Sequence, residues 1–369
     1  MNQLLSLDIK ELKQLFPEPK YLAGQLFAFL HEGATFDEMT SLKKDFREHL
    51  NEHYIANPVS IRKKFVGKSG TIKYLFELTD GNLIEGVYMP HDYGNTLCLS
   101  TQIGCRMGCT FCASGLDGLL RNLTAGEMLG QVIAVNRDNG GSIKNRAVTN
   151  LVLMGSGEPF DNYDNTLKFL SLVSAEKGIN ISERNISLST SGLADKVKMF
   201  ADSGHKVTLS ISLHAPFDEL RSNIMPVNKK YNVKDIVSAS RYYFEKTGRR
   251  VIFEYTLIKG NNDSDACARE LAKLTQGFPS HVNLIRLNEV KERDHVAPSE
   301  DATKEFLKKL EKLGVSATIR RSLGNDIEGA CGQLRRRYLE EQINNKKNGK
   351  TNKNTKRTSN KSSCFKVFC

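Results

Sequence analysis

The residues with the clearest chemical potential are three cysteines within eight positions, Cys105, Cys109 and Cys112. Thiolates at this spacing bind zinc or an iron–sulfur cluster. No histidine stands near them in the sequence to complete a four-ligand set, and catalytic metal sites keep one coordination position open. The triplet therefore predicts either a cluster with one iron that lacks a protein ligand, or a zinc knuckle that takes its fourth ligand from elsewhere.

A second group of residues follows stretches that favour strands. The group consists of Gly157, Glu158, Ser189, Ser212, Leu213, His214 and Asn288. Taken singly, each is typical of an ordinary turn or helix cap. Because the carboxyl ends of parallel strands meet at one end of a barrel, we expect these residues to form a single ligand site.

The elements that must position these residues alternate between strand and helix after residue 95. Strands are predicted over Thr96–Thr101, Thr149–Met154, Asn185–Ser189, Val207–Leu213, Val251–Leu257, Val282–Leu287 and Val315–Ile319. Helices are predicted between most of them, and the first opens with a capping box at Thr124 and Glu127. Repeated β-then-α units indicate a parallel sheet. The predicted fold class is α/β, with a partial, open barrel of the (β/α)6 type.

By pattern and composition the 369 residues divide into four segments. Residues 1–57 are expected to form a helical accessory domain, 58–92 a β-rich linker, 93–341 the barrel core and 342–369 a basic tail. The tail carries eight Lys or Arg and no Asp or Glu, so the net charge of +11 falls to +3 without it (11 − 8). Such a tail can add affinity for nucleic acid, but its composition is more typical of a solvated, disordered chain end.

Hydropathy and cysteine usage indicate the compartment. No apolar run approaches the roughly 18 residues that span a bilayer, and the N-terminus lacks the pattern of a secretory signal. We therefore expect a cytoplasmic protein without a membrane partner, whose eight cysteines are reduced thiols and are considered first as ligands or catalysts, not as a disulfide framework. Cys267, Cys364 and Cys369 match no motif and are expected to have no such role.

The cysteine spacing, with Phe111 before the last thiol, resembles the signature of the radical S-adenosylmethionine (SAM) superfamily. Over about residues 1–340 the chain resembles, more specifically, the RlmN-type dual-specificity RNA methyltransferases and their Cfr-type relatives. The further segments that carry this resemblance are Ile84–Val87, Thr96–Ser100, Gly155–Pro159, Ser212–Pro216, Met225–Asn228, Val282–Ile285 and Ala330–Leu334. Pro159 favours the enzymes that methylate carbon 2 of adenine; the Cfr-type alternative methylates carbon 8.

The resemblance implies two cofactors and a substrate. It implies a [4Fe-4S] cluster on the three cysteines, with SAM bound by the strand-end residues named above. The implied product is 2-methyladenine, in 23S rRNA at the peptidyl-transferase centre and in tRNA next to the anticodon. A monomeric protein and a flavodoxin-type electron donor are also expected.

The resemblance further implies a methyl-cysteine intermediate and two SAM molecules. Cys331 would carry the methyl group that is added to the base. Glu85 would act as the general base that removes the carbon-2 proton. Cys98 would then attack Cys331, which frees the product and leaves a disulfide bond to be reduced.

Without the resemblance, plainer interpretations of these residues stay open. Cys98 would be a small buried apolar residue, Glu85 a solvated charge at a sheet edge, and Cys331 either structural or catalytic. The alternative from another class is a zinc-stabilised RNA-binding module without catalysis. That alternative predicts no role for Glu85, Cys98 or Cys331.

Overall fold

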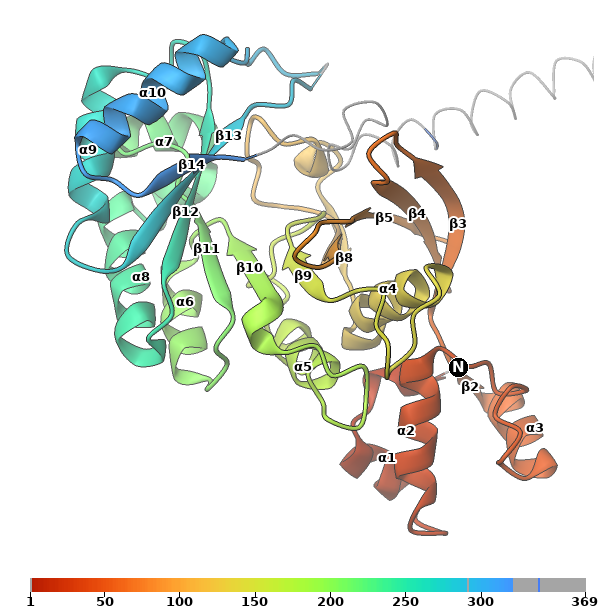
Figure 1. Cartoon of the computed structure of the whole chain (residues 1–369). Helices are drawn as coiled ribbons and strands as arrows, with labels where there is room; N and C mark the ends of the chain where they lie inside the picture. The colour runs from red at the N-terminus through yellow and green to blue at the C-terminus, as the bar shows by residue number, and fades with distance from the viewer. Residues whose placement is uncertain (1, 291, 321–337, 339–369) are drawn as a thin grey trace, which may run out of the picture.

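In the computed structural model, one mixed sheet of ten strands forms the centre of the described chain, which comprises residues 2–290, 292–320 and 338 (Figure 1). The strand order is β14-β13-β12-β11-β10-β9-β6-β5-β4-β3. The bounds are Val59–Val66 (β3), Ile72–Leu78 (β4), Leu83–Met89 (β5), Thr96–Cys98 (β6), Asn150–Leu153 (β9), Ile186–Thr190 (β10), Thr208–Ser212 (β11), Val251–Leu257 (β12), Ser280–Arg286 (β13) and Ala317–Ile319 (β14). From β6 through β9 to β14 all neighbours are parallel. The sheet does not close, because β14 and β3 are its two ends. The predicted open α/β barrel is confirmed.

Helices follow the parallel strands and cover one side of the sheet (Figure 1). Their bounds are Ala125–Asp138 (α4), Tyr163–Val173 (α5), Ala194–Asp202 (α6), Asp218–Ile224 (α7), Val233–Thr247 (α8), Asp265–Thr275 (α9) and Glu300–Lys312 (α10). The predicted capping box opens α4: Thr124 Oγ1 accepts from the Glu127 backbone N–H at 3.0 Å, and the Glu127 side chain accepts from Thr124 N at 2.9 Å. The short helix α7 was not predicted, although it lies directly against the site described below.

Alternating residues give the parallel strands two different faces. Leu97 and Leu151 are fully buried in the main core, which packs against the helices. Cys98 pairs with Val152, which in turn pairs with Ser187. These residues therefore point to the opposite side of the sheet, which we call the inner face.

The predicted β-rich linker is part of the same sheet. Strands β3, β4 and β5 form an antiparallel meander, and β5 pairs with β6 through Val87 and Cys98. Residues 58–92 thus extend the inner face beyond the barrel strands. Composition did not reveal this, because the pairing of β5 with β6 is a matter of register and not of residue type.

The N-terminal helices stand below the sheet in Figure 1, and α2 among them contacts α4. They are Ile9–Leu15 (α1), Leu22–Glu32 (α2) and Lys44–His53 (α3), and the short strands Asn2–Gln3 (β1) and Tyr54–Ile55 (β2) pair beside them. Ser6 Oγ accepts from the Gly126 backbone N–H at 3.1 Å, and Gln3 accepts from the Thr124 hydroxyl at 2.7 Å. No helix in the described part of the chain is long and apolar enough to cross a membrane.

Candidate active site

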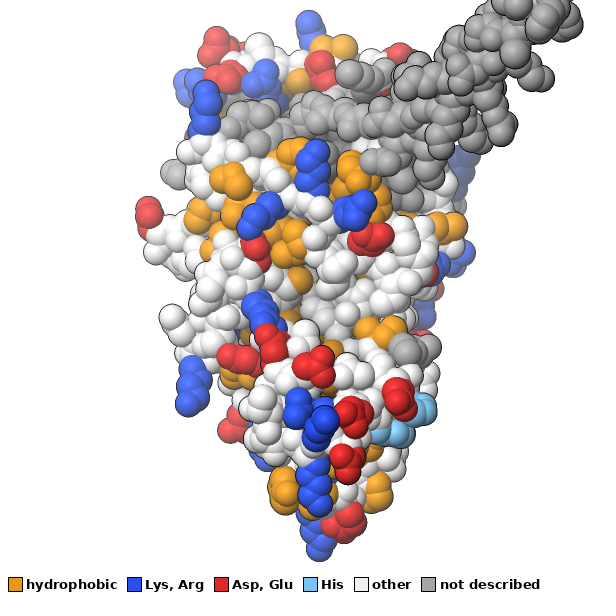
Figure 2. All heavy atoms as spheres, turned by 90° about the vertical axis from the view of Figure 1, so that its right-hand side faces the viewer, with side chains coloured by type: hydrophobic (Ala, Val, Ile, Leu, Met, Phe, Trp, Pro, Cys, Tyr) orange, Lys and Arg blue, Asp and Glu red, His pale blue; other side chains and the backbone are white. Residues whose placement is uncertain are grey.

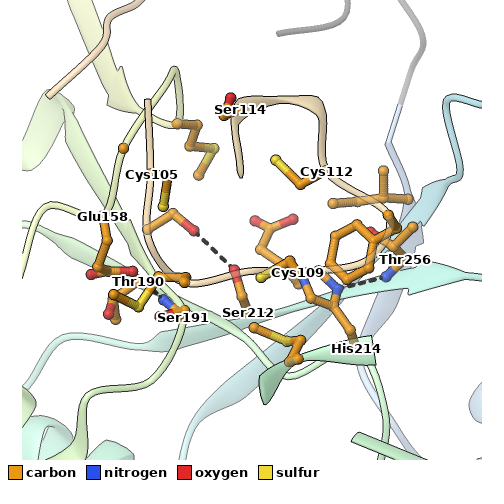
Figure 3. Close-up of a pocket in the computed structure, with 18 of the residues that line it drawn as sticks. Cys105, Cys109, Cys112, Ser114, Glu158, Thr190, Ser191, Ser212, His214 and Thr256 are labelled. Carbon is orange, nitrogen blue, oxygen red and sulfur yellow. Dashed lines mark hydrogen bonds between the residues drawn. The ribbon is translucent and has the colours of Figure 1, made fainter. Parts of the chain in front are cut away.

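A cavity of about 230 Å³ opens at the carboxyl ends of the strands (Figure 3). Its lining includes most of the residues predicted to form one site: Cys105, Cys109, Cys112, Gly157, Glu158, Ser189, Ser212 and His214. These residues come from the cysteine loop and from the ends of β9, β10 and β11. The structure thus brings the strand-end residues of this set together around one cavity, and their role as a ligand site stays a prediction.

The cysteine loop follows β7 (Gln102–Gly104), which pairs with β8 (Leu119–Asn122) in a small sheet of its own. Gly104 has a φ of 76°, and a Cβ there would lie 2.0 Å from the carbonyl oxygen of Gly118, so the turn into the loop requires glycine. Three contacts fasten the loop over the cavity. Arg106 forms an ion pair with Asp161, Thr110 Oγ1 lies 2.7 Å from His295 Nε2, and Thr110 N donates to Ile224 O at 2.9 Å.

The three thiols suit a cluster better than a single ion. Burial raises the pKa of Cys105 to about 12 and that of Cys109 further still, so both thiols are protonated until a metal displaces the protons. Among the described residues, no three His, Cys, Asp or Glu side chains converge closely enough to hold one metal ion. The sulfurs instead surround the cavity (Figure 3), as the separated irons of a cluster require.

Glu158 is fixed at the end of β9 beside the cysteine loop. Its carboxylate accepts backbone N–H groups from Ser191 at 2.6 Å and from Phe160 at 3.0 Å. Burial is the main cause that raises the pKa of this carboxyl, although those N–H groups act in the opposite direction. Gly157 has a φ of 113°, and a Cβ there would lie 2.6 Å from Thr101 Oγ1. Backbone therefore lies directly against backbone at this wall of the cavity.

His214 follows β11 in an unusual conformation, with a φ of 55°. Its Nδ1 accepts the Thr256 backbone N–H at 2.9 Å, and its carbonyl oxygen accepts from Asn262 at 2.6 Å. Burial lowers the pKa of His214 to about 3, so the imidazole is neutral and its proton lies on Nε2. The cavity wall thus contains a neutral N–H donor rather than a cation.

Sequence reasoning missed several lining residues, chiefly Glu254 and Thr256 of β12 and Arg320 after β14. Glu254 accepts from Asn283 at 2.9 Å, and burial raises the pKa of its carboxyl. The signal was available in Val251–Leu257, where two polar residues two positions apart interrupt an apolar strand. Such spacing places both on one face.

Two predicted ligand residues lie elsewhere. Leu213 has a fully buried side chain in the main core, and Asn288 is an exposed residue after β13. Neither lines the cavity described above. Their contacts with SAM stay predictions.

Glu85 and Cys98 lie together on the inner face. Cys98 is opposite Val87 on the neighbouring strand, and Glu85 is two residues from Val87 on the same side. Both side chains are buried. Glu85 lines a small second cavity that shares Ser114 with the first, so the carboxylate and the cysteine loop are neighbours.

Cys331 lies outside the described residues. The described chain reaches Arg320, which lines the main cavity, and includes Tyr338, which packs with Leu75 and Leu83 on the inner face. The expected disulfide bond between Cys98 and Cys331 is not supported, because the described part of the chain contains no disulfide.

Fold and site together define a radical SAM protein: the family model described as the radical SAM superfamily matches residues 99–271. A probable dual-specificity RNA methyltransferase RlmN of Alkaliphilus oremlandii is 50% identical over 342 residues, which cover 91% of this chain and 98% of the relative. A protein with the same description from Clostridium novyi is 46% identical over 345 residues, covering 92% and 99%. The crystal structure of a radical SAM methyltransferase from Sphaerobacter thermophilus matches with a TM-score of 0.86 and 42% identity, covering 90% of this chain and 99% of that one. The chain therefore belongs to the RlmN family, as the sequence motifs predicted.

Proposed function

We propose that the chain is a radical SAM methyltransferase that forms 2-methyladenine in RNA, both in 23S rRNA at the peptidyl-transferase centre and in tRNA next to the anticodon. The observation that carries the proposal is that Glu85 and Cys98 are adjacent on the inner face, beside a cavity lined by three cysteines. The zinc-stabilised RNA-binding alternative has no use for a buried carboxylate and a thiol at this place.

The cavity residues fit both cofactors. Cys105, Cys109 and Cys112 would hold a [4Fe-4S] cluster. The residues that would hold SAM are Gly157, Glu158, Ser189, Ser212, Leu213, His214 and Asn288. When bound, the cluster and SAM would supply a 5′-deoxyadenosyl radical, a species able to remove one hydrogen atom from a sulfur-bound methyl group so that its carbon can bond to the base.

The chain's own residues would do the rest of the chemistry. Carbon 2 of adenine is electron-poor, so it does not attack a SAM methyl group as a nucleophile would. Cys331 would therefore first accept a methyl group from one SAM and then deliver that carbon to the base. Glu85 would remove the carbon-2 proton from the adduct. Cys98 would attack the Cys331 sulfur, which breaks its bond to the product carbon and forms a disulfide bond.

Three observations support this assignment. Glu85 forms an ion pair with Lys73, whose Nζ lies 3.1 Å from Oε2. Cys98 is a diagonal neighbour of Glu85 across two strands. Cys331 lies in sequence between Arg320 and Tyr338, which contact the cavity and the inner face respectively.

Binding of RNA and delivery of electrons are the remaining parts of the proposal. Figure 2 shows Lys and Arg side chains interspersed with acidic and apolar ones on the side of the molecule that it displays. Arg62, Lys63 and Lys64 of the edge strand β3 are partly or largely exposed and offer charge to phosphate. Charge on an edge strand also prevents unwanted strand pairing. A flavodoxin-type protein would supply the electron, and the enzyme would act as a monomer in the cytoplasm.

Mass spectrometry of RNA tests the product. The chain is expressed in a bacterial strain that lacks its own 2-methyladenine enzyme, and 23S rRNA and tRNA are digested to nucleosides. We expect 2-methyladenosine from the wild type and from Cys267→Ala, a buried cysteine of α9, and none from Cys105→Ser. Formation of 8-methyladenosine instead would assign the Cfr-type activity.

A further inference from the structure

Arg221 is a fully buried arginine on α7, with an exposed fraction of 0%. Its guanidinium donates to the backbone oxygens of Ser191 at 2.6 Å, Ser212 at 2.9 Å and Leu213 at 2.9 Å. The fourth bond, at 3.0 Å, goes to Oδ1 of Asn228. The side chain therefore joins the ends of β10 and β11 at the wall of the cavity.

All four of these acceptors are neutral. Within the described part of the chain, no Asp or Glu forms an ion pair with Arg221. Asp218, an exposed residue of the same helix, favours the charged form of Arg221, but its carboxylate accepts from the Asn228 amide and forms no ion pair with the guanidinium. Burial lowers the pKa of Arg221 to about 10, so the group is still a cation at neutral pH. A buried charge without a counter-charge is costly, and folded proteins normally supply a counter-charge.

Among the negative groups that act on Arg221, Cys109 has the larger effect and Asp218 the smaller. Ile224 and Met225, one turn after Arg221, pack with Cys109 and Phe111 in a small apolar cluster. The backbone N–H of Thr110 donates to Ile224 O at 2.9 Å, which fixes α7 against the cysteine loop. Arg221 favours the thiolate form of Cys109, and Cys109 in turn favours the charged form of Arg221.

We propose that Arg221 is the counter-charge of the iron–sulfur cluster and that it raises the reduction potential of the cluster. The inference rests on the proposed cofactor, and it makes Arg221 a positioning residue with an electrostatic role. Three thiolates and a cluster core of charge 2+ have a net charge of −1. One electron from the donor protein makes this −2, so a fixed cation nearby stabilises the reduced form more than the oxidised form.

Redox titration followed by electron paramagnetic resonance tests the proposal on the cluster-loaded full chain. Arg221→Met removes the charge, and Arg221→Lys keeps a charge but cannot make all four bonds. Arg241→Met is the matched control, because Arg241 also donates to two backbone oxygens, those of Gly277 and Gln276, but lies on α8 outside the cavity. Iron content and the visible spectrum show whether each variant holds its cluster.

We expect Arg221→Met to lower the ratio of reduced to oxidised cluster at a fixed potential by about tenfold, or about 59 mV for a one-electron couple. Arg221→Lys and Arg241→Met should keep a reduction potential close to that of the wild type.

The other outcomes separate the charge of residue 221 from its hydrogen bonds. If Arg221→Met loses its cluster while Arg221→Lys keeps a cluster of wild-type potential, the cluster depends on the charge, and the proposal is supported. A wild-type potential in Arg221→Met overturns the proposal. Loss of the cluster in both variants also overturns it, because the hydrogen bonds would then matter and not the charge. Colourless, iron-free wild type would instead contradict the proposed function itself.

Discussion

Lys73 and Glu85 form an ion pair inside the protein, with 3.1 Å between Nζ and Oε2, although their side chains are 0% and 7% exposed. Leu75 is the direct partner of Glu85 across β4 and β5, so Lys73 is its diagonal neighbour on the inner face. The ion pair fixes the position of the Glu85 carboxylate on the inner face, where the proposed function requires a general base.

Lys73→Met leaves the charge of Glu85 buried without this cation. We expect the free energy of unfolding to fall by roughly 3 to 5 kcal/mol, the usual cost of removing one partner of a buried pair. Urea denaturation measures the change. The double variant Lys73→Met/Glu85→Leu should recover most of the loss. A double variant no more stable than Lys73→Met would show that the pair is not the cause.

His31 should make the protein sensitive to acid. Burial lowers its pKa to about 3 from 6.5, so between these values the unfolded chain binds a proton that the folded chain does not. Stability is therefore lost as pH falls below 6.5, at about 1.4 kcal/mol per pH unit for such a group. His214 acts in the same direction.

The measurement is urea denaturation of wild type and His31→Gln at several pH values between 5 and 8. The variant should lose less stability than wild type on going from pH 7 to pH 5. At pH 8 the histidine is neutral in both states, so any difference there reports packing and the hydrogen bond that His31 Nδ1 accepts from the Ile179 backbone N–H. Parallel curves over the whole range would contradict the assignment.

Replacing any of the three cluster cysteines should abolish iron binding. We expect Cys105→Ser, purified without oxygen, to be colourless and nearly free of iron, whereas Cys267→Ser should resemble wild type. Cys267 is the appropriate control because it is a buried thiol on α9, outside the cavity. Iron and sulfide analysis decides the matter, and a full complement of iron in Cys105→Ser would refute the ligand assignment.

Glu158→Gln should weaken SAM binding. The carboxylate accepts two backbone N–H groups, and an amide can accept only through its single oxygen, so the end of β9 would shift. We expect the dissociation constant for SAM to rise roughly tenfold, since a hydrogen bond to a charged group contributes about 1.5 kcal/mol or more. Equilibrium dialysis of the cluster-loaded protein measures it. Glu183→Gln, the same substitution outside the cavity, should leave the dissociation constant for SAM unchanged. If Glu158→Gln binds SAM as tightly as Glu183→Gln does, Glu158 is not part of the SAM site.

Local sequence patterns predicted the parallel strands and the strand ends at which the predicted site residues lie. Val251–Leu257 was predicted with its observed bounds, and the Thr124 capping box was correct, because both depend on residues close in sequence. Glu158, Ser189, Ser212 and His214 were expected in one site because parallel strands share an end, and the resemblance to radical SAM enzymes placed the cysteine triplet beside them.

Contacts between distant segments could not be predicted in this way. The pairing of Lys73 with Glu85 depends on the register of β4 against β5, which no single strand encodes. Arg221 gave no signal either, because a buried arginine and a surface arginine look alike in a sequence. Its role emerges only when α7 is packed against the cysteine loop.

The most direct test of the proposed chemistry compares wild type with Cys331→Ala. The cluster-loaded proteins are incubated without oxygen with labelled SAM, a reductant and a fragment of 23S rRNA. We expect the wild type to form 2-methyladenine together with 5′-deoxyadenosine, and Cys331→Ala to form no methylated base. If Cys331→Ala still methylates adenine, the methyl group does not pass through that cysteine, and the roles proposed for Cys331 and Cys98 are wrong even if the cluster is present.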